Sequence, residues 1–262
     1  MKMVVSPSFA SLRPLLERIV AGTYTPQHVY CHRRNVVERV VAADRQCVVV
    51  KRFRTPNALN RWVYGLLRKS KARRAYEYGM RLLQAGIATP QPIAYMEERR
   101  GCRFARSWLV SEQAKGTPFS ELYACLRNQA AQGDGEAATT MQQLRTALTK
   151  YVIHLEQHCI CPGDFNHANI IVEQREGRFH FQLVDINRMR FGRTPTLKST
   201  MKMYSQFCRS YQDAVDFLSL YAESKGIDFD HCMYVFARQR HHLLRRKQRK
   251  QMAHKLLHDD RQ

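Results

Sequence analysis

The sequence has few acidic residues for its length, and it lacks the patterns of secreted, membrane-spanning and zinc-binding chains. Of its 262 residues, 22 are Asp or Glu and 43 are Lys or Arg, so the formal net charge is +21. No segment approaches the roughly 18 consecutive apolar residues that mark a membrane span, and segment 1–20 lacks the apolar core of a signal peptide. The eight cysteines include no C-x-x-C pair, so neither a disulfide framework nor a zinc site is expected. These absences favour a cytoplasmic protein.

The positive charge indicates what the protein binds rather than how it folds. Nucleic acid, an anionic membrane surface and a polyanionic substrate would each suit it. Segment 238–262 holds nine Lys or Arg against two Asp, together with a narrow apolar stripe. A basic helix with such a stripe is typical of proteins that lie on a membrane surface. The alternative is a solvated terminal helix that packs its stripe on the body. The stripe consists of Leu243, Leu244, Met252, Leu256 and Leu257.

The first part of the chain is expected to be rich in strands. Residues 28–54 alternate β-branched and polar residues in HVYCHR, VVERVVA and QCVVVKRF, a pattern typical of strands. A helical pattern runs from about residue 60 to 85, with two helices meeting near Ser70 as one arrangement and Gly86 as its C-terminal cap. Strands are then expected in IATPQPIAYME and FARSWLVSE.

The second part is expected to be mainly helical. Helices are predicted at 119–130 and 136–158, with a loop at 133–135 between them. The strand FHFQLVDI (179–186) precedes a mostly helical remainder. A hinge near Glu112–Gly116 separates the parts. We therefore predict an α+β protein with a β-rich N-lobe over 1–114, which includes one key helix, and a helical C-lobe over 115–262.

Five residues follow the order of the active-site residues in protein-kinase-like phosphotransferases. Lys51 ends an apolar strand, and Glu77 lies within the first predicted helix. Asp164 and Asn169 stand five apart in CPGDFNHANIIV, directly before an apolar strand, and Asp185 ends the apolar stretch LVD. The combination predicts a kinase-like phosphotransferase with a bilobal protein-kinase-like fold.

Each residue type suits one task in phosphoryl transfer, which must neutralise dense negative charge and align the reacting groups. Lys51 would contact the α- and β-phosphates of ATP, with Glu77 fixing its flexible side chain. Asn169 and Asp185 offer the hard oxygen ligands that Mg²⁺ prefers. Asp164 would accept a hydrogen bond from the acceptor hydroxyl.

Glu112 and Gln113, at the predicted hinge, are further candidates for nucleotide binding.

Ordinary structural roles remain as alternatives for the five residues. A lysine at a strand end is usually solvated, and Glu77 on an arginine-rich helix is more often part of a surface ion pair. Asp164 and Asn169 also suit a simple turn.

Three segments carry a family resemblance. SKARRAYEYGMRLLQAGIATPQPIAYME, CPGDFNHANIIV and VDINRMRFG resemble the lipopolysaccharide kinase (Kdo/WaaP) family, over about residues 48–192. The resemblance implies a bilobal kinase fold, ATP with Mg²⁺, and a lipid-linked inner-core sugar, Kdo or heptose, as acceptor at the cytosolic face of the inner membrane. It also implies the roles given above for the five residues. The acceptor and the membrane are both anionic, which suits a basic peripheral enzyme.

The sequence departs from kinase patterns at three places. No G-x-G-x-x-G precedes Lys51, so another turn or basic side chains such as Arg33 and Arg34 would cover the phosphates. Pro162 stands where a histidine usually supports the catalytic loop, and Asn187 replaces the glycine of D-F-G. These departures predict a different support for the loop.

Two other functions remain as alternatives. One is a kinase acting on another small molecule or on a protein. The other is a basic nucleic-acid-binding protein, although the sequence has neither an aromatic RNP-like motif nor a helix-turn-helix pattern. With the kinase interpretation no nucleic-acid partner is expected.

Overall fold

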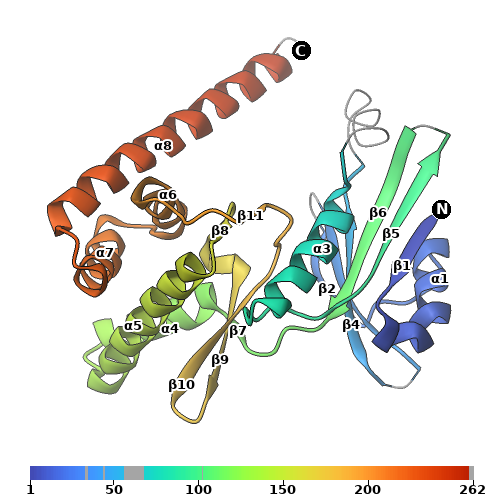
Figure 1. Ribbon diagram of the computed structural model, residues 1–262, viewed down its shortest axis with the longest axis horizontal. Coiled ribbons are helices and arrows are strands. Elements are labelled where there is room, and N and C mark those ends of the chain that lie inside the picture. Colours follow the sequence, from blue (N-terminus) through green and yellow to red (C-terminus); the bar gives the residue numbers. More distant parts are fainter. Residues whose placement is uncertain (33–34, 44, 56–67, 102, 260–262) are drawn as a thin grey trace. The chain divides into compact units, whose positions relative to one another are not determined.

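The computed structural model of the protein describes residues 1–32, 35–43, 45–55, 68–101 and 103–259, with side chains of the last helix described to Met252. The chain forms two compact units (Figure 1). The first comprises Met1–Lys115 and Gln182–Arg188, and the second Gly116–Phe181 and Met189–Gln262. The predicted limits of the lobes, 1–114 and 115–262, stay a prediction.

The first unit is built on a six-stranded sheet with strand order β1-β5-β6-β4-β3-β2 and antiparallel neighbours. The strands predicted over 28–54 and in the two later segments are confirmed. The N-terminal elements were not predicted: a strand, a 3₁₀ helix η1 (Pro7–Leu12) and a helix α1 (Arg13–Ala21). The strands are β1 (Lys2–Val5), β2 (His28–His32), β3 (Val36–Val41), β4 (Cys47–Phe53), β5 (Pro92–Arg100) and β6 (Arg103–Glu112).

The two faces of this sheet pack against different helices. Strand side chains alternate between the faces, so Val50 joins Leu16 and Ile19 of α1 in one buried cluster. Phe53, of opposite parity, packs with Ala72 of helix α3 (Lys71–Gln84) in another. Burying each large apolar side chain contributes about 1.5–3 kcal/mol, and together the clusters fix the sheet between α1 and α3.

Helix α3 begins and ends at local signals in the sequence. Ser70 caps its start, because the Ser70 hydroxyl accepts a hydrogen bond from the Arg73 amide at 3.0 Å. Gly86, with φ +72°, follows its end and takes the left-handed conformation that favours glycine. Gly79 permits close packing on β5, since a Cβ there would lie 2.5 Å from Pro92 Cγ. The part of the predicted helical stretch from residue 60 to 67 lies outside the described residues.

The second unit is mainly helical, as predicted. A three-stranded sheet of order β10-β9-β7 and a two-stranded β11-β8 sheet connect its helices. The predicted strand FHFQLVDI is shorter than expected, because β10 ends at Leu183. The strands are β7 (Thr117–Pro118), β8 (Ile160–Pro162), β9 (Ile170–Arg175), β10 (Arg178–Leu183) and β11 (Met189–Phe191), and the helices are α4 (Phe119–Ala131), α5 (Gly135–Gln157), α6 (Leu197–Phe207), α7 (Tyr211–Lys225) and α8 (Phe229–Asp259).

Aromatic packing joins the helices of this unit. Phe207 of α6 lies 5.1 Å from Phe119 of α4 and 5.1 Å from Phe217 of α7, measured between ring centroids. Such pairs add about 0.5–1.5 kcal/mol each beyond the area they bury. The cluster holds α4, α6 and α7 around the loop that follows β8.

Helix α8 packs on α6 and α7 and then continues beyond them (Figure 1). Arg240 ties it to α6 through a 2.6 Å hydrogen bond to the Ser205 carbonyl. From there as far as Met252, almost all side chains are exposed to solvent. Leu244 and Met252 of the apolar stripe are 44% and 66% exposed. These two stripe residues therefore do not pack on the body. Within the described residues, the helices all lack either the length or the apolar content that crossing a membrane requires.

Candidate active site

Lys51 lies near the end of β4, on the sheet face that carries α3. Its ammonium group forms a 2.6 Å ion pair with Asp185 Oδ1 and lies 5.4 Å from the centre of the Phe53 ring. The Lys51 side chain is only 15% exposed, so this charge is partly removed from water and its ion pair is stronger than one at the open surface. The pair brings together two residues 134 positions apart, both within the first unit.

Asp185 sits in a short segment that is fixed to the first unit two residues before it, at Leu183. Leu183 donates its amide to the Ala88 carbonyl at 3.0 Å, and the Thr89 hydroxyl donates to the Leu183 carbonyl at 2.6 Å. Asp185 itself has φ +54°, a left-handed conformation that is uncommon for a residue other than glycine and is often found at functional sites. The Asn187 amide nitrogen donates to Asp185 Oδ1 at 2.5 Å. The backbone and its neighbours thus aim this carboxylate.

Glu77 does not form the predicted ion pair with Lys51. Its carboxylate is bound instead by Lys69 at 2.7 Å and by Arg73 at 2.8 Å. Burial disfavours the Glu77 charge, but the hydrogen bonds from Lys69 and Arg73 outweigh it and lower the pKa of the carboxyl. The correction has a local cause: Arg73 stands one helical turn before Glu77, the spacing at which side chains on a helix meet.

Glu112 and Gln113 lie where β6 ends. The Glu112 amide donates to the Gln91 carbonyl at 2.9 Å, and the Gln113 side-chain amide donates to the Tyr30 hydroxyl at 3.1 Å. Tyr30 belongs to the edge strand β2, so Gln113 connects the end of β6 to that edge. The role of Glu112 and Gln113 in nucleotide binding stays a prediction.

Asp164 and Asn169 are connected by the loop between β8 and β9 in the second unit. Asn169 Nδ2 donates to the Asp164 carbonyl at 2.9 Å, and Asn166 Nδ2 donates to Asp164 Oδ1 at 3.0 Å. The Asn166 oxygen in turn caps the short helix η2 (His167–Asn169) by accepting from the Ala168 amide at 3.0 Å. Because the nitrogen of Asn169 is engaged, its side-chain oxygen is the atom that remains to bind a cation.

The support of this loop comes from its own buried side chains. Phe165 and His167 alternate with the polar residues and are 1% and 2% exposed. The His167 ring lies 4.2 Å from the Phe207 ring and 4.9 Å from the Phe119 ring, between centroids. Burial, followed by the charge of Arg209, lowers the pKa of His167 from 6.5 to about 4. His167 therefore anchors the loop as a neutral side chain.

Pro162, which replaces the usual supporting histidine, belongs to β8 and lies opposite Met189 of β11. Sequence reasoning missed two residues that support the loop instead, Asn166 and His167. The first could have been found from its position two residues before Ala168, since Asn commonly accepts from an amide two positions on. The buried environment of His167 has no comparable local pattern. Arg33 and Arg34, proposed to cover phosphates, lie outside the described residues.

The donor groups fit a magnesium ion better than a transition metal. Asp185 and Asn169 supply carboxylate and amide oxygens, each in its own unit, and Mg²⁺ usually takes few protein ligands with waters and substrate phosphates. Across the described part of the chain, no group of three or more His, Cys, Asp or Glu side chains is arranged to hold a metal.

Comparison with known proteins gives a family and a fold. The family described as Lipopolysaccharide kinase (Kdo/WaaP) family matches residues 32–221. A 3-deoxy-D-manno-octulosonic acid kinase from Mannheimia succiniciproducens is 27% identical over 129 residues, which is 49% of each chain. The match thus spans about half the length of this curated relative.

Among solved structures, WaaP in complex with acyl carrier protein superposes with a TM-score of 0.61 at 16% identity, covering 95% of this chain and 99% of the other. At this identity the likeness shows the fold, and it confirms the predicted bilobal kinase-like architecture. The Rio2 kinase from Chaetomium thermophilum is 13% identical, with a TM-score of 0.48 over 90% and 76% of the two chains.

Proposed function

Because the chain belongs to the lipopolysaccharide kinase (Kdo/WaaP) family, we propose that it transfers the γ-phosphate of ATP to a sugar hydroxyl of the lipopolysaccharide inner core, on Kdo or heptose. The observation that carries the proposal is the 2.6 Å pair between Lys51 and Asp185. Phosphoryl transfer needs a cation for the phosphates beside an acid for the metal, and the pair supplies both from distant parts of the sequence.

The residues of the first unit would bind the nucleotide. Lys51 would contact its phosphates, and Asp185 would hold a magnesium ion. Magnesium would neutralise the charge that develops on the transferred group. Glu77, held by Lys69 and Arg73, would act on Lys51 only after a rearrangement of α3 side chains. Glu112 and Gln113 would contact the base through the segment after β6.

The loop of the second unit would receive the acceptor. Asp164 is half-buried and accepts from Asn166 on one oxygen, so its other oxygen is the one to orient the sugar hydroxyl. Asn169 would offer its amide oxygen to a magnesium ion. The Asn169 hydrogen bond to the Asp164 backbone links the two tasks, because a shift of either residue moves the other.

The basic surface would bring the protein to its acceptor. Inner-core lipopolysaccharide is anchored in an anionic membrane, and each basic residue near such a surface contributes about 1 kcal/mol. The described end of α8 presents a set of exposed basic side chains: Arg245, Arg246, Lys247, Arg249 and Lys250. We therefore propose that α8 holds the protein on the cytosolic face of the inner membrane.

The test is phosphate transfer from radiolabelled ATP with Mg²⁺ to two purified acceptors, one ending in Kdo and one carrying heptose. Transfer to one acceptor identifies the sugar. Asp164→Asn should retain nucleotide binding and lose transfer by about 10²–10⁴-fold, the usual size of a general acid–base contribution. Asp230→Asn, an exposed acid on α8, is the matched control and should transfer at the wild-type rate. Label found only in protein would refute the proposal, as would full activity in Asp164→Asn.

A further inference from the structure

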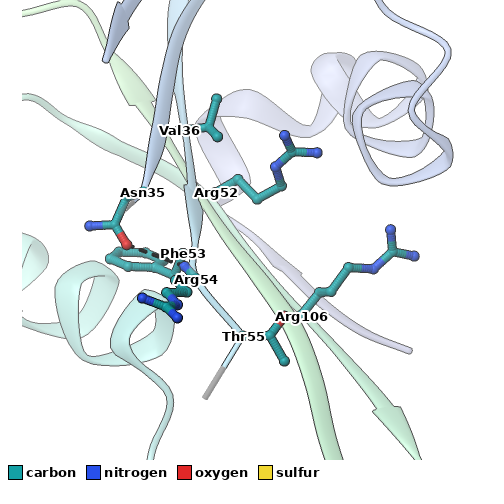
Figure 2. Close-up of a pocket in the computed structure, with 7 residues that line it drawn as sticks. All are labelled: Asn35, Val36, Arg52, Phe53, Arg54, Thr55 and Arg106. Atoms are coloured by element: carbon teal, nitrogen blue, oxygen red, sulfur yellow. Dashed lines mark hydrogen bonds between the residues drawn. The ribbon is translucent and has the colours of Figure 1, made fainter. Parts of the chain in front are cut away.

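A cavity of about 370 Å³ lies at the end of β4, and its described lining residues include three arginines and no acid. The arginines are Arg52, Arg54 and Arg106 (Figure 2). Its size lies at the lower end of the range for small-molecule sites, about 300–1,000 Å³. All of its lining residues belong to the first unit.

Two of these arginines lie on the sheet face opposite Lys51. Arg52 follows Lys51 in β4, so its side chain points to the other face. Arg52 lies directly across from Trp108 on β6, and Arg106 stands two residues before Trp108 on the same face. Figure 2 shows Arg52 and Arg106 extending to the same side of the sheet, while Arg54 lies beside Phe53 and Asn35.

The charge of the cavity is only partly compensated. Among the described residues, Arg52 and Arg54 are exposed and form no ion pair. Arg106 donates through Nε to Glu98 Oε2 at 2.5 Å, which leaves its terminal nitrogens as further donors. The Arg106 guanidinium also lies 5.3 Å from the centre of the Trp108 ring, and this contact fixes its position.

A second acid on the Arg52 face, besides Glu98, is already engaged in a hydrogen bond. Glu38 is buried on β3, two residues beyond Val36, which pairs with Arg52. The Glu38 carboxylate accepts a hydrogen bond from the Tyr24 hydroxyl. Arg52 and Arg106 are diagonal neighbours on adjacent strands, a spacing that long side chains can bridge, so an anion between them would be attracted by both.

We propose that this cavity binds an oxyanion, a phosphate or carboxylate carried on a sugar, between Arg52 and Arg106. Guanidinium groups bind such oxyanions through paired hydrogen bonds, with a geometry that lysine lacks. The cavity is larger than a phosphate group alone, and Val36 and Thr55 line it where the sugar ring would lie. Phe53, which also lines the cavity, belongs to the Lys51 face, but Arg52 and Arg106 lie on the other face. The anion would therefore bind apart from the proposed phosphoryl-transfer residues, and the proposal does not rest on the proposed function.

The chain contains a natural reporter for this site. It has two tryptophans, and a Trp62→Phe background leaves Trp108, beneath Arg106, as the sole indole fluorophore. In that background the protein is titrated with glucose 6-phosphate, and with glucose as the uncharged control at the same ionic strength. A second arm uses vesicles with and without phosphatidic acid, so that a soluble sugar phosphate and a lipid headgroup are distinguished.

Glucose 6-phosphate or the phosphatidic acid vesicles should give a saturable change that glucose and neutral vesicles do not. The variant Arg52→Gln/Arg106→Gln should bind at least tenfold more weakly. Arg13→Gln, which removes an exposed arginine of α1 outside the cavity, should bind as the parent does, and so should Lys51→Met. Should the double variant fail to fold by circular dichroism, the single Arg52→Gln variant takes its place, since Arg52 has no ion pair with any residue that the structure describes.

Three results would overturn the proposal. The first is no saturable change in either arm. The second is equal affinity in the arginine variant and in Arg13→Gln, which would assign the response to net charge. The third is loss of binding in Lys51→Met, which would place the anion at the proposed phosphoryl-transfer residues. Phosphate transfer is measured separately on the same variants, and its result tests the proposed function and not the anion site.

Discussion

The buried histidine of the loop between β8 and β9 predicts that this protein loses stability in mild acid. His167 is 2% exposed and packs against Phe119 and Phe207. Burial and the charge of Arg209 lower its pKa from 6.5 to about 4, with Asp213 opposing the shift. The folded protein therefore holds this imidazole neutral at a pH where the unfolded chain would already protonate it.

The sign and size of the effect follow from proton binding. Between pH 6.5 and 4 the unfolded chain binds more protons at His167 than the folded protein, so the free energy of unfolding rises with pH in this window. The contribution is fully present above about pH 6.5 and is lost as the pH falls toward 4. With about 1.4 kcal/mol per pKa unit, the total is about 3 kcal/mol, of which about 2 kcal/mol is lost by pH 5.

Urea unfolding at pH 7.5 and pH 5.0 measures this directly. His167→Leu replaces the imidazole with an apolar side chain of similar size, which does not bind a proton. The wild-type protein should lose about 2 kcal/mol more than His167→Leu between the two pH values. His180→Gln, an exposed histidine of β10, should lose as much as the wild type. Equal losses in wild type and His167→Leu would refute the reasoning, because other titrating groups are common to both.

Three further predictions concern the backbone, the metal ligand and the membrane. Gly116→Ala should lower the free energy of unfolding by about 3 kcal/mol in urea, since φ is +110° and a Cβ would lie 2.2 Å from the Val172 carbonyl oxygen; an unchanged midpoint would contradict this. Asn187→Ala should weaken Mg²⁺-ATP binding about tenfold by losing one charge-assisted hydrogen bond to Asp185, measured with a fluorescent nucleotide, whereas equal affinity would remove Asn187 from this role. Charge reversal on α8 should lower co-sedimentation with anionic vesicles at least 100-fold and leave neutral vesicles unaffected; unchanged sedimentation would exclude α8 as the membrane contact. The reversed residues are Arg245, Arg246, Lys247 and Lys250.

The elements that carry local patterns could be predicted from the sequence. The strand that ends near Lys51 shows β-branched residues and the helix that holds Glu77 shows a 3.6-residue period, each bounded by breakers. A helix boundary near Ser70 was one of the predicted arrangements, and α3 begins directly after Ser70. The N-terminal segment was missed because Pro7 and Pro14 interrupt its pattern, yet Pro14 lies in the first turn of α1, where proline is tolerated.

Side-chain partners could not be predicted in the same way, because they depend on segments far apart in the sequence. The order of residues paired Lys51 with Glu77, as in kinases. In the structure Arg73 reaches Glu77 from one helical turn away, while Asp185 reaches Lys51 because hydrogen bonds to Ala88 and Thr89 hold its segment against the first unit. The spacing of residues in the sequence predicts the Arg73–Glu77 contact, but it does not predict the Lys51–Asp185 contact.

The structure explains why asparagine follows two residues after Asp185 in the sequence D-I-N. Asp185 Oδ1 accepts from both Lys51 and Asn187, so two donors bind one oxygen and Oδ2 lies outside both contacts. A carboxylate oxygen oriented in this way suits a cation with hard ligands. A glycine at position 187 has no side-chain donor and could offer only its backbone amide. Asn187 therefore helps to orient the Asp185 carboxylate. Without the Asn187 side chain, Lys51 would be the remaining one of these two donors to Oδ1.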